Sequence, residues 1–158
     1  TRIDLSSGPS IGTEGTISFM AYNVGCSNNQ IAFMFSDSSY MADFLYTARF
    51  IYSPVGATFY NNTSVCPDSN WKHHIVVYEN TRVQTWYVNG SAVSADSVSG
   101  DHFDSNMTLT SMGSRSGFGT NGMNGYLDEV IWLNRPLSEN EALNLYFQQM
   151  VNHRPLRY

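Results

Sequence analysis

Apolar and polar residues alternate along several short stretches of the chain, and this spacing is typical of β-strands. Residues 16–21 and 31–35 place apolar side chains at every second position, which predicts strands with one buried face. Residues 44–52 alternate in two sets, with Tyr46 and Tyr52 on one face and Arg49 on the other. A pattern of period two fixes this alternation but does not fix which face meets solvent.

Other stretches rich in β-branched and aromatic residues predict further strands, with turn residues or polar loops between them. They are residues 57–60, 71–78, 83–88, 107–112 and 126–133. The loop over residues 114–124 is rich in glycine. Short strands at this spacing, followed by one late helix, predict an all-β antiparallel sandwich in a single domain.

The late helix has a clear start signal. Pro136 ends the preceding strand, because proline has no N–H for a strand ladder. Ser138 stands three residues before Glu141, which is a capping box ahead of the apolar residues of 142–145. The pattern therefore predicts a short helix that begins directly after Ser138.

Composition narrows the class of protein. Only 13% of the 158 residues are charged, the single lysine is Lys72, and the net charge is −5. Nucleic acid and anionic membrane surfaces attract basic patches, so this balance argues against both as partners. No run of apolar residues approaches the ~18 needed to cross a membrane, so membrane insertion is not expected. The chain begins almost directly on strand-like sequence, as expected of a mature or excised module.

A polar surface of Ser, Thr, Asn and Gly suits an extracellular, cell-surface or virion-surface protein. In that setting Cys26 and Cys66, the only cysteines, would pair as a disulfide, and two buried free thiols are the alternative. Several asparagines start N-x-[ST] glycosylation sequences, although such sequences also arise by chance. These asparagines are Asn61, Asn62, Asn89 and Asn106. Asn89 also precedes Gly90, and Asn-Gly is a favoured hairpin turn whether or not it is glycosylated.

Four motifs together resemble the laminin G-like domains (type 3) of the concanavalin A-like lectin/glucanase superfamily. The strand, turn and helix over residues 125–146 resemble the family's C-terminal pattern G-x-[LI]-D-E-[VI]…R-[AP]-L-S-x-x-E. Residues 71–73 resemble its W-x-H strand, residues 87–90 its Y-V-[DN]-G hairpin, and residues 112–113 the Gly that precedes its final loop. The resemblance covers nearly the whole chain.

The resemblance implies a jelly-roll β-sandwich with one short C-terminal helix. We expect the domain to span residues 1–150, with residues 151–158 as a tail or linker. It also implies a non-catalytic extracellular recognition module that binds a glycan or glycoprotein receptor as part of a larger adhesin, receptor or virion surface protein. A protein-binding or spacer module, which could form a homo-oligomer through its parent protein, is the alternative.

Calcium is the cofactor that the resemblance implies, because related domains hold Ca²⁺ with an aspartate of the late strand and loop carbonyls. Asp128 is the matching position, and an acid that only accepts neighbouring backbone N–H bonds is the alternative. Residues 101–106 also bring three oxygen-bearing side chains together, but they lack the glycine and the final glutamate of an EF-hand loop. A solvated loop is the better interpretation there.

Catalysis is not expected. Glucanases on this fold carry an E-x-D-x-x-E motif, and the sequence has no glutamate followed two positions later by an aspartate. Retaining hydrolysis needs two carboxyl groups about 5 Å apart, so hydrolysis by this route is not expected. No G-x-S-x-G elbow accompanies the histidines, and His73 is expected to be a hydrogen-bonded structural residue.

Sugar recognition requires aromatic faces together with amides or charged groups that bond hydroxyls. The chain has ten Tyr, nine Phe and three Trp, and the tryptophans fall in strands that match buried family positions. Trp86 and Tyr87 are neighbours in one strand, so one of them points away from the core. The predicted glycan-binding residues are Arg49, Tyr87, Arg115, Phe118, Asn121 and Asn124.

Overall fold

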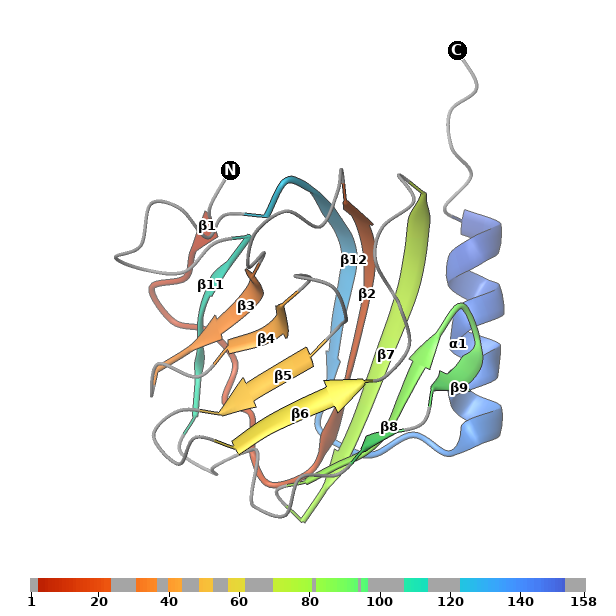
Figure 1. Cartoon of the computed structure of the whole chain (residues 1–158), viewed down its shortest axis with the longest axis horizontal. Coiled ribbons are helices and arrows are strands. Elements are labelled where there is room, and N and C mark those ends of the chain that lie inside the picture. Colours follow the sequence, from red (N-terminus) through yellow and green to blue (C-terminus); the bar gives the residue numbers. More distant parts are fainter. Residues whose placement is uncertain are drawn as a thin grey trace.

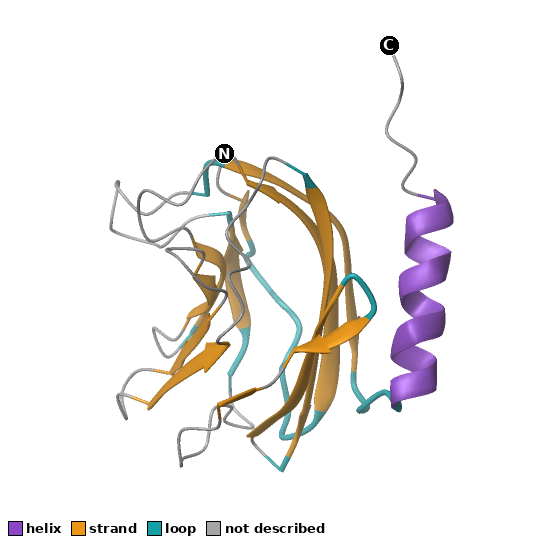
Figure 2. Cartoon of the chain, turned by 45° about the vertical axis from the view of Figure 1, so that its right-hand side comes forward, coloured by secondary structure: helices purple, strands orange, loops and turns teal. Residues whose placement is uncertain are grey.

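Two antiparallel β-sheets pack face to face in the computed structural model, and one helix lies outside them (Figures 1 and 2). The structure describes residues 3–23, 31–36, 40–43, 49–52, 57–61, 70–80, 82–93, 95–96, 107–113 and 123–152. This arrangement confirms the predicted sandwich with one C-terminal helix.

In the described part of the chain, one sheet has seven strands and the other has five, and every neighbouring pair is antiparallel. The seven-stranded sheet has the order β1 (Ile3–Asp4), β11 (Leu109–Met112), β3 (Ile31–Phe35), β4 (Tyr40–Asp43), β5 (Arg49–Tyr52), β6 (Ala57–Asn61) and β10 (Ala95–Asp96). The five-stranded sheet has the order β12 (Gly125–Leu133), β2 (Gly15–Asn23), β7 (Trp71–Glu79), β8 (Arg82–Val88) and β9 (Ser91–Val93). The helix α1 spans Glu139–Asn152, two residues beyond the predicted domain boundary at 150.

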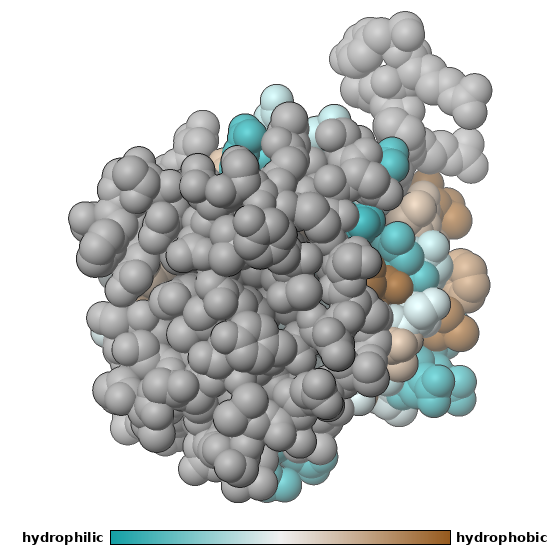
Figure 3. Space-filling model, in the orientation of Figure 1, coloured by the Kyte–Doolittle hydropathy of each residue, from teal (hydrophilic) through white to brown (hydrophobic). Residues whose placement is uncertain are grey.

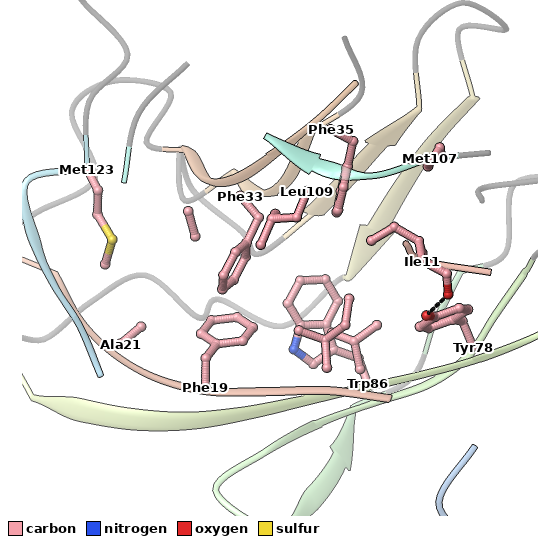
Figure 4. Packing of buried hydrophobic residues seen from close by; sticks show 13 residues of the cluster. Ile11, Phe19, Ala21, Phe33, Phe35, Tyr78, Trp86, Met107, Leu109 and Met123 are labelled. Carbon is pink, nitrogen blue, oxygen red and sulfur yellow. Dashed lines mark hydrogen bonds between the residues drawn. The ribbon is translucent and has the colours of Figure 1, made fainter. Parts of the chain in front are cut away.

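The main core lies between the sheets and combines aromatic with aliphatic side chains and methionines (Figure 4). Phe19 from β2 meets Phe33 from β3 edge to face, with ring centroids 4.9 Å apart. Trp86 is fully buried, and its indole Nε1 donates to His74 Nδ1 over 3.3 Å. Full burial of one such side chain contributes roughly 1.5–3 kcal/mol, so this layer helps to hold the two sheets together.

A polar contact closes one end of this core. The buried Tyr78 hydroxyl donates to the Ile11 carbonyl over 2.7 Å, the dashed line in Figure 4. A buried hydroxyl without such a partner would destabilise the fold, so the contact fixes the segment that leads into β2. Burial raises the pKa of Tyr78 to about 12, which keeps the hydroxyl protonated as a donor.

A second core lies between the outer face of the five-stranded sheet and α1. In Figure 2 the sheet curves away from the helix, which lies along its convex side. Ile75, Val77 and Tyr87 from the sheet pack there with Leu137 and Ala142. The prediction that β2 is half-buried is wrong, because its second face is buried as well. Thr16, Ser18 and Met20 on that face are each 0% exposed.

The predicted capping box forms at the start of α1. The backbone N–H of Ser138 donates to Glu141 Oε2 over 2.9 Å, and the N–H of Glu141 points back to Ser138 Oγ at 3.4 Å. Arg135 also donates to Glu141 Oε1 over 2.8 Å. This guanidinium, followed by the Ser138 donors, lowers the pKa of Glu141 to about 2.

The predicted hairpin at Asn89-Gly90 is confirmed. Both residues have positive φ angles, 50° and 77°, as a two-residue type I′ turn requires. The Asn89 side chain accepts a hydrogen bond from the His73 backbone N–H over 2.9 Å, which ties the turn to β7. A side chain at Gly90 would lie 2.7 Å from the Tyr146 ring, so the turn also fits closely against α1.

Candidate functional site

Three aromatic residues form a row across neighbouring strands on the outer face of the five-stranded sheet. Tyr126 of β12 pairs with Tyr22 of β2, and Tyr22 pairs with Trp71 of β7. Directly paired positions place their side chains on the same face of a sheet. Register alone therefore brings these three rings together, and we call this set the aromatic row.

The rings of the aromatic row touch one another and line a shallow depression. The Tyr22 ring centroid lies 5.7 Å from that of Trp71 and 6.0 Å from that of Tyr126, and the Trp71 and Tyr126 centroids are 6.4 Å apart. The ring planes are tilted by 54°, 50° and 34°, so the rings form a shallow cup of about 380 Å³. Tyr126 is 66% exposed, which leaves its ring face open to a ligand.

The helix leaves the aromatic row uncovered. His73, two residues along β7 from Trp71 on the same face, is only 1% exposed and stacks under Tyr146 of α1. Tyr22 and Trp71 themselves are only partly buried. The row therefore lies just beyond the part of the sheet that α1 protects.

Exposed large apolar residues of the described chain gather in two places. Leu143, Phe147, Met150 and Val151 lie on α1, and Figure 3 shows this apolar surface over the helix at the right of the molecule. The remaining ones are Ile3, Tyr126 and Val130, and all of them line one cavity of about 240 Å³. We call this cavity the apolar groove. Its lining residues are Ile3, Met112, Gly113, Met123, Gly125, Tyr126, Leu127 and Val130.

Asp128 lies two residues beyond Tyr126, is exposed, and accepts the backbone N–H of Glu129 at Oδ1 over 2.8 Å. Glu129 has a φ of 49°, and the pairing of β12 with β2 shifts register between Asp128 and Ile131, so this is a β-bulge. The side chain of Asp128 thus stabilises a strained turn of backbone. Within the described residues, no group of three or more His, Cys, Asp or Glu side chains could hold a metal ion.

His73 has the structural role that the sequence predicted. Its Nε2 lies 2.7 Å from Ser18 Oγ, while Nδ1 has no hydrogen-bond partner among the described residues. Burial lowers the pKa of His73 to about 4, and burial with the nearby His73 and Lys72 charges lowers that of His74 to about 3. Ser18 and His73 are both buried, and Tyr146 of α1 stacks on His73, so the Ser18 hydroxyl is not an accessible nucleophile.

Two of the predicted glycan-binding residues, Tyr87 and Asn124, have side chains that the structure describes. Tyr87 does point away from the inter-sheet core, but it is only 7% exposed because it packs in the second core beneath α1. A ring buried there offers no face to a sugar, so we no longer include Tyr87 in the site. Asn124 is exposed just before β12. The side chain of Arg49 on β5, and Arg115, Phe118 and Asn121, lie outside the described residues.

The remaining predictions concern modification. Cys26, Cys66, Asn62 and Asn106 lie outside the described residues, as does the side chain of Asn61 on β6. Asn89 is exposed, but its side-chain oxygen is already bonded to the His73 backbone.

Sequence reasoning missed the aromatic row. It assigned Trp71 to the core with the other tryptophans, although Trp71 shares a face with His73 and meets solvent at the start of its strand. Tyr22 follows Met20 on the non-core face of β2, and this alternation could have marked it. The meeting of Tyr22, Trp71 and Tyr126 depends on strand register, which the sequence does not display.

Comparison with known families gives a clear assignment. The Laminin_G_3 model of the concanavalin A-like lectin/glucanases superfamily matches residues 6–142. The chain belongs to this superfamily. The match confirms the resemblance drawn from the motifs. No curated protein sequence matches the chain.

Solved structures share the fold at low sequence identity. Domain 4 of AbnA, an extracellular arabinanase from Geobacillus stearothermophilus solved with arabinotriose, superposes with a TM-score of 0.69 at 15% identity, covering 92% of this chain and 72% of that one. The binding domain of botulinum neurotoxin serotype D gives 0.62 at 12%, covering 95% and 40%. A Trypanosoma rangeli sialidase with 2,3-difluorosialic acid gives 0.60 at 13%, covering 87% and 23%. The chain thus spans less than half the length of the last two.

Among the described residues, no helix is both long and apolar enough to cross a membrane.

Proposed function

We propose that this domain is a non-catalytic recognition module that binds carbohydrate through the aromatic row. The observation that supports this proposal most is that Tyr22, Trp71 and Tyr126 form an uncovered cup beside the part of the sheet that α1 buries. Sugar rings stack on such faces through their C–H groups, and the chain's superfamily includes lectins. An extracellular or surface location as part of a larger protein fits this role.

Polar residues around the row supply partners for sugar hydroxyls. Asn70 precedes Trp71, Asn124 precedes Tyr126 by two residues, and Asp128 follows it by two, and all three are exposed. A shallow cup buries little area, so one site would bind with millimolar affinity, about −4 kcal/mol. Repeated copies of the module on its parent protein would raise this through avidity.

A glycan array tests the proposal. The labelled, multivalent domain should bind a defined subset of glycans, and Trp71→Ala should reduce affinity for them about tenfold, equal to ~1.4 kcal/mol. Phe147→Ala is the matched control, because Phe147 is also an exposed aromatic residue, 56% exposed, but lies on α1. No binding above background, or equal losses in both variants, would count against carbohydrate recognition at the row.

Calcium remains a proposal to be tested in the same experiment. The described residues around the site offer the Asp128 carboxylate, whereas Ca²⁺ takes 6–8 oxygen ligands. The other oxygen ligands would therefore have to come from further groups beside Asp128. Repeating the array with a chelator would show whether loop ligands complete a site, since binding would then fall.

Self-association through α1 is the second candidate function. The apolar residues Leu143, Phe147, Met150 and Val151 recur at helical spacing and are exposed together. No charged residue occurs from 142 to 152, so two copies could pair along this face without local repulsion despite a net charge of −5. Native mass spectrometry should then show a dimer that Phe147→Asp disrupts, and a native domain that stays monomeric would contradict it.

A further inference from the structure

The apolar groove adjoins the aromatic row, and Tyr126 lines both. Its ring is therefore the boundary between a surface suited to a sugar and a surface suited to an apolar group. No other described residue appears in both linings. A ligand that stacks on Tyr126 would reach the groove with its next few atoms.

The groove is built into the edge of the sandwich. It lies where β1 and β12, the terminal strands of the two sheets, approach each other. Met123 forms part of its floor and is held by its N–H bond to the Gly113 carbonyl over 2.8 Å, while the Gly113 N–H donates to Ala32 over 2.8 Å. Ile3, 52% exposed, and Val130, 36% exposed, form its lips.

The described lining of the groove suits an apolar occupant. Among the described residues that line it, none is charged, and Tyr126 alone has a polar side-chain group. Apolar surface left in water costs roughly 25 cal/mol per Å², so covering the lips is favourable. A volume of about 240 Å³ holds a group of several carbons, because an engineered apolar cavity of roughly 150 Å³ holds benzene.

The flanking strand edges do not suit an added protein strand. β1 has only two residues, and very short edge strands offer few pairing groups. β12 carries the bulge at Asp128–Glu129, where Glu129 has a φ of 49°, and a bulge interrupts the ladder that a new strand would need. The exposed apolar side chains are thus not part of a strand-pairing edge.

We propose that the apolar groove binds the alkyl chain of a glycolipid whose sugar stacks on the aromatic row. This inference rests on the proposed carbohydrate-binding function and names its ligand class. The sugar contacts Tyr126 from the row, and the carbons that follow the glycosidic oxygen pass between Ile3 and Val130. The head group gives selectivity and the chain adds affinity.

A series of alkyl glycosides tests the inference with the whole domain. Methyl, butyl, hexyl and octyl glycosides of the sugar that the array selects are titrated by calorimetry, below the concentration at which they form micelles. Affinity should rise with chain length by up to about fourfold for each buried CH₂ and level off once the groove is full. The readout is the ratio of octyl to methyl affinity, which we expect to exceed about thirtyfold.

Matched variants assign the gain to the groove. Val130→Asn should bring the octyl-to-methyl ratio close to one, and Ile3→Asn provides a second lip variant if the first folds poorly. Val151→Asn makes the same change at an exposed valine of α1 and should keep the native ratio. A native ratio near one, or a high ratio that survives both lip variants, would overturn the inference.

Failure of the proposed function gives a different result. If methyl glycosides do not bind and the octyl glycoside binds no better than 1-octanol, the domain does not recognise the sugar. The glycolipid inference then falls because its carbohydrate half is wrong. If methyl glycosides bind and chain length has no effect, carbohydrate recognition stands and the assignment of the groove is wrong.

Discussion

The ring of Tyr146 on α1 stacks on the imidazole of His73 on β7, with centroids 5.8 Å apart and planes 17° apart. The same Tyr146 ring lies against the Asn89-Gly90 turn, whose Asn89 is bonded to the His73 backbone. One aromatic contact therefore joins helix, sheet and hairpin. It also marks the last position on β7 that α1 covers before the aromatic row begins.

Removing this contact should loosen the helix. We expect Tyr146→Ala to lower the free energy of unfolding by about 2 kcal/mol, because it deletes a ring packed against both His73 and Gly90. Urea denaturation followed by tryptophan fluorescence measures the change. Phe147→Ala, at the exposed neighbouring position, should cost less than about 1 kcal/mol, and equal losses would contradict the role given to Tyr146.

Acid should destabilise the domain through His73 and His74. Their pKa values are about 4 and about 3 in the folded state against an ordinary 6.5, so the unfolded chain binds more protons between these values. The stability that the neutral histidines contribute is therefore fully present above pH 6.5 and is lost as the pH drops towards 4. For His73 alone the free energy of unfolding should fall by about 3 kcal/mol, at 1.36 kcal/mol for each pKa unit. A charged His73 would also carry an N–H on Nδ1 with no acceptor among the described residues.

Denaturation midpoints at pH 7, 5.5 and 4.5 measure this effect. The carboxylate of Glu141, with its pKa lowered to about 2, loses its contribution only below pH 4.5, so the two effects occupy different windows. If the denaturation midpoint does not change from pH 7 to 4.5, protonation of the buried histidines does not destabilise the fold.

The capping box should account for a measurable part of helix stability. Ser138→Ala removes the hydroxyl that accepts the Glu141 N–H and donates to its carboxylate, and we expect a loss of about 1 kcal/mol. Ser138→Thr keeps a capping oxygen and is the control. Circular dichroism during urea unfolding gives both values, and a threonine variant as unstable as the alanine variant would argue against a capping effect.

Tyr126 should affect both halves of the proposed ligand. Tyr126→Ala is expected to weaken methyl and octyl glycosides and to reduce their ratio, because the ring lines both the cup and the apolar groove. Trp71→Ala should weaken the two glycosides by the same factor and leave their ratio unchanged, since Trp71 lines only the cup. Titration calorimetry measures both affinities for each variant. If Tyr126→Ala and Trp71→Ala have the same octyl-to-methyl ratio, Tyr126 does not contribute to the apolar groove.

Local patterns in the sequence predicted much of the fold. The strand β2, the Asn89-Gly90 turn and the Ser138–Glu141 box each depend on residues close together in the chain, and each forms where it was predicted, although the second face of β2 is buried as well. The burial of Tyr87 could not be read this way, because it results from a helix about 55 residues later that folds back over β8. The aromatic row escaped prediction for the same reason, since it depends on which strands pair and in what register.

The Thr16 hydroxyl donates to the Arg135 carbonyl over 3.0 Å and accepts the Leu137 N–H over 3.0 Å, contacts that span 119 and 121 residues. β2 also takes β12 as a neighbour, so the first long strand completes its pairing only with the last one. During synthesis, one edge of β2 therefore stays unpaired until almost the whole chain has been made. A fold closed in this way should form slowly, and premature termination before β12 should leave an aggregation-prone strand rather than a smaller working domain.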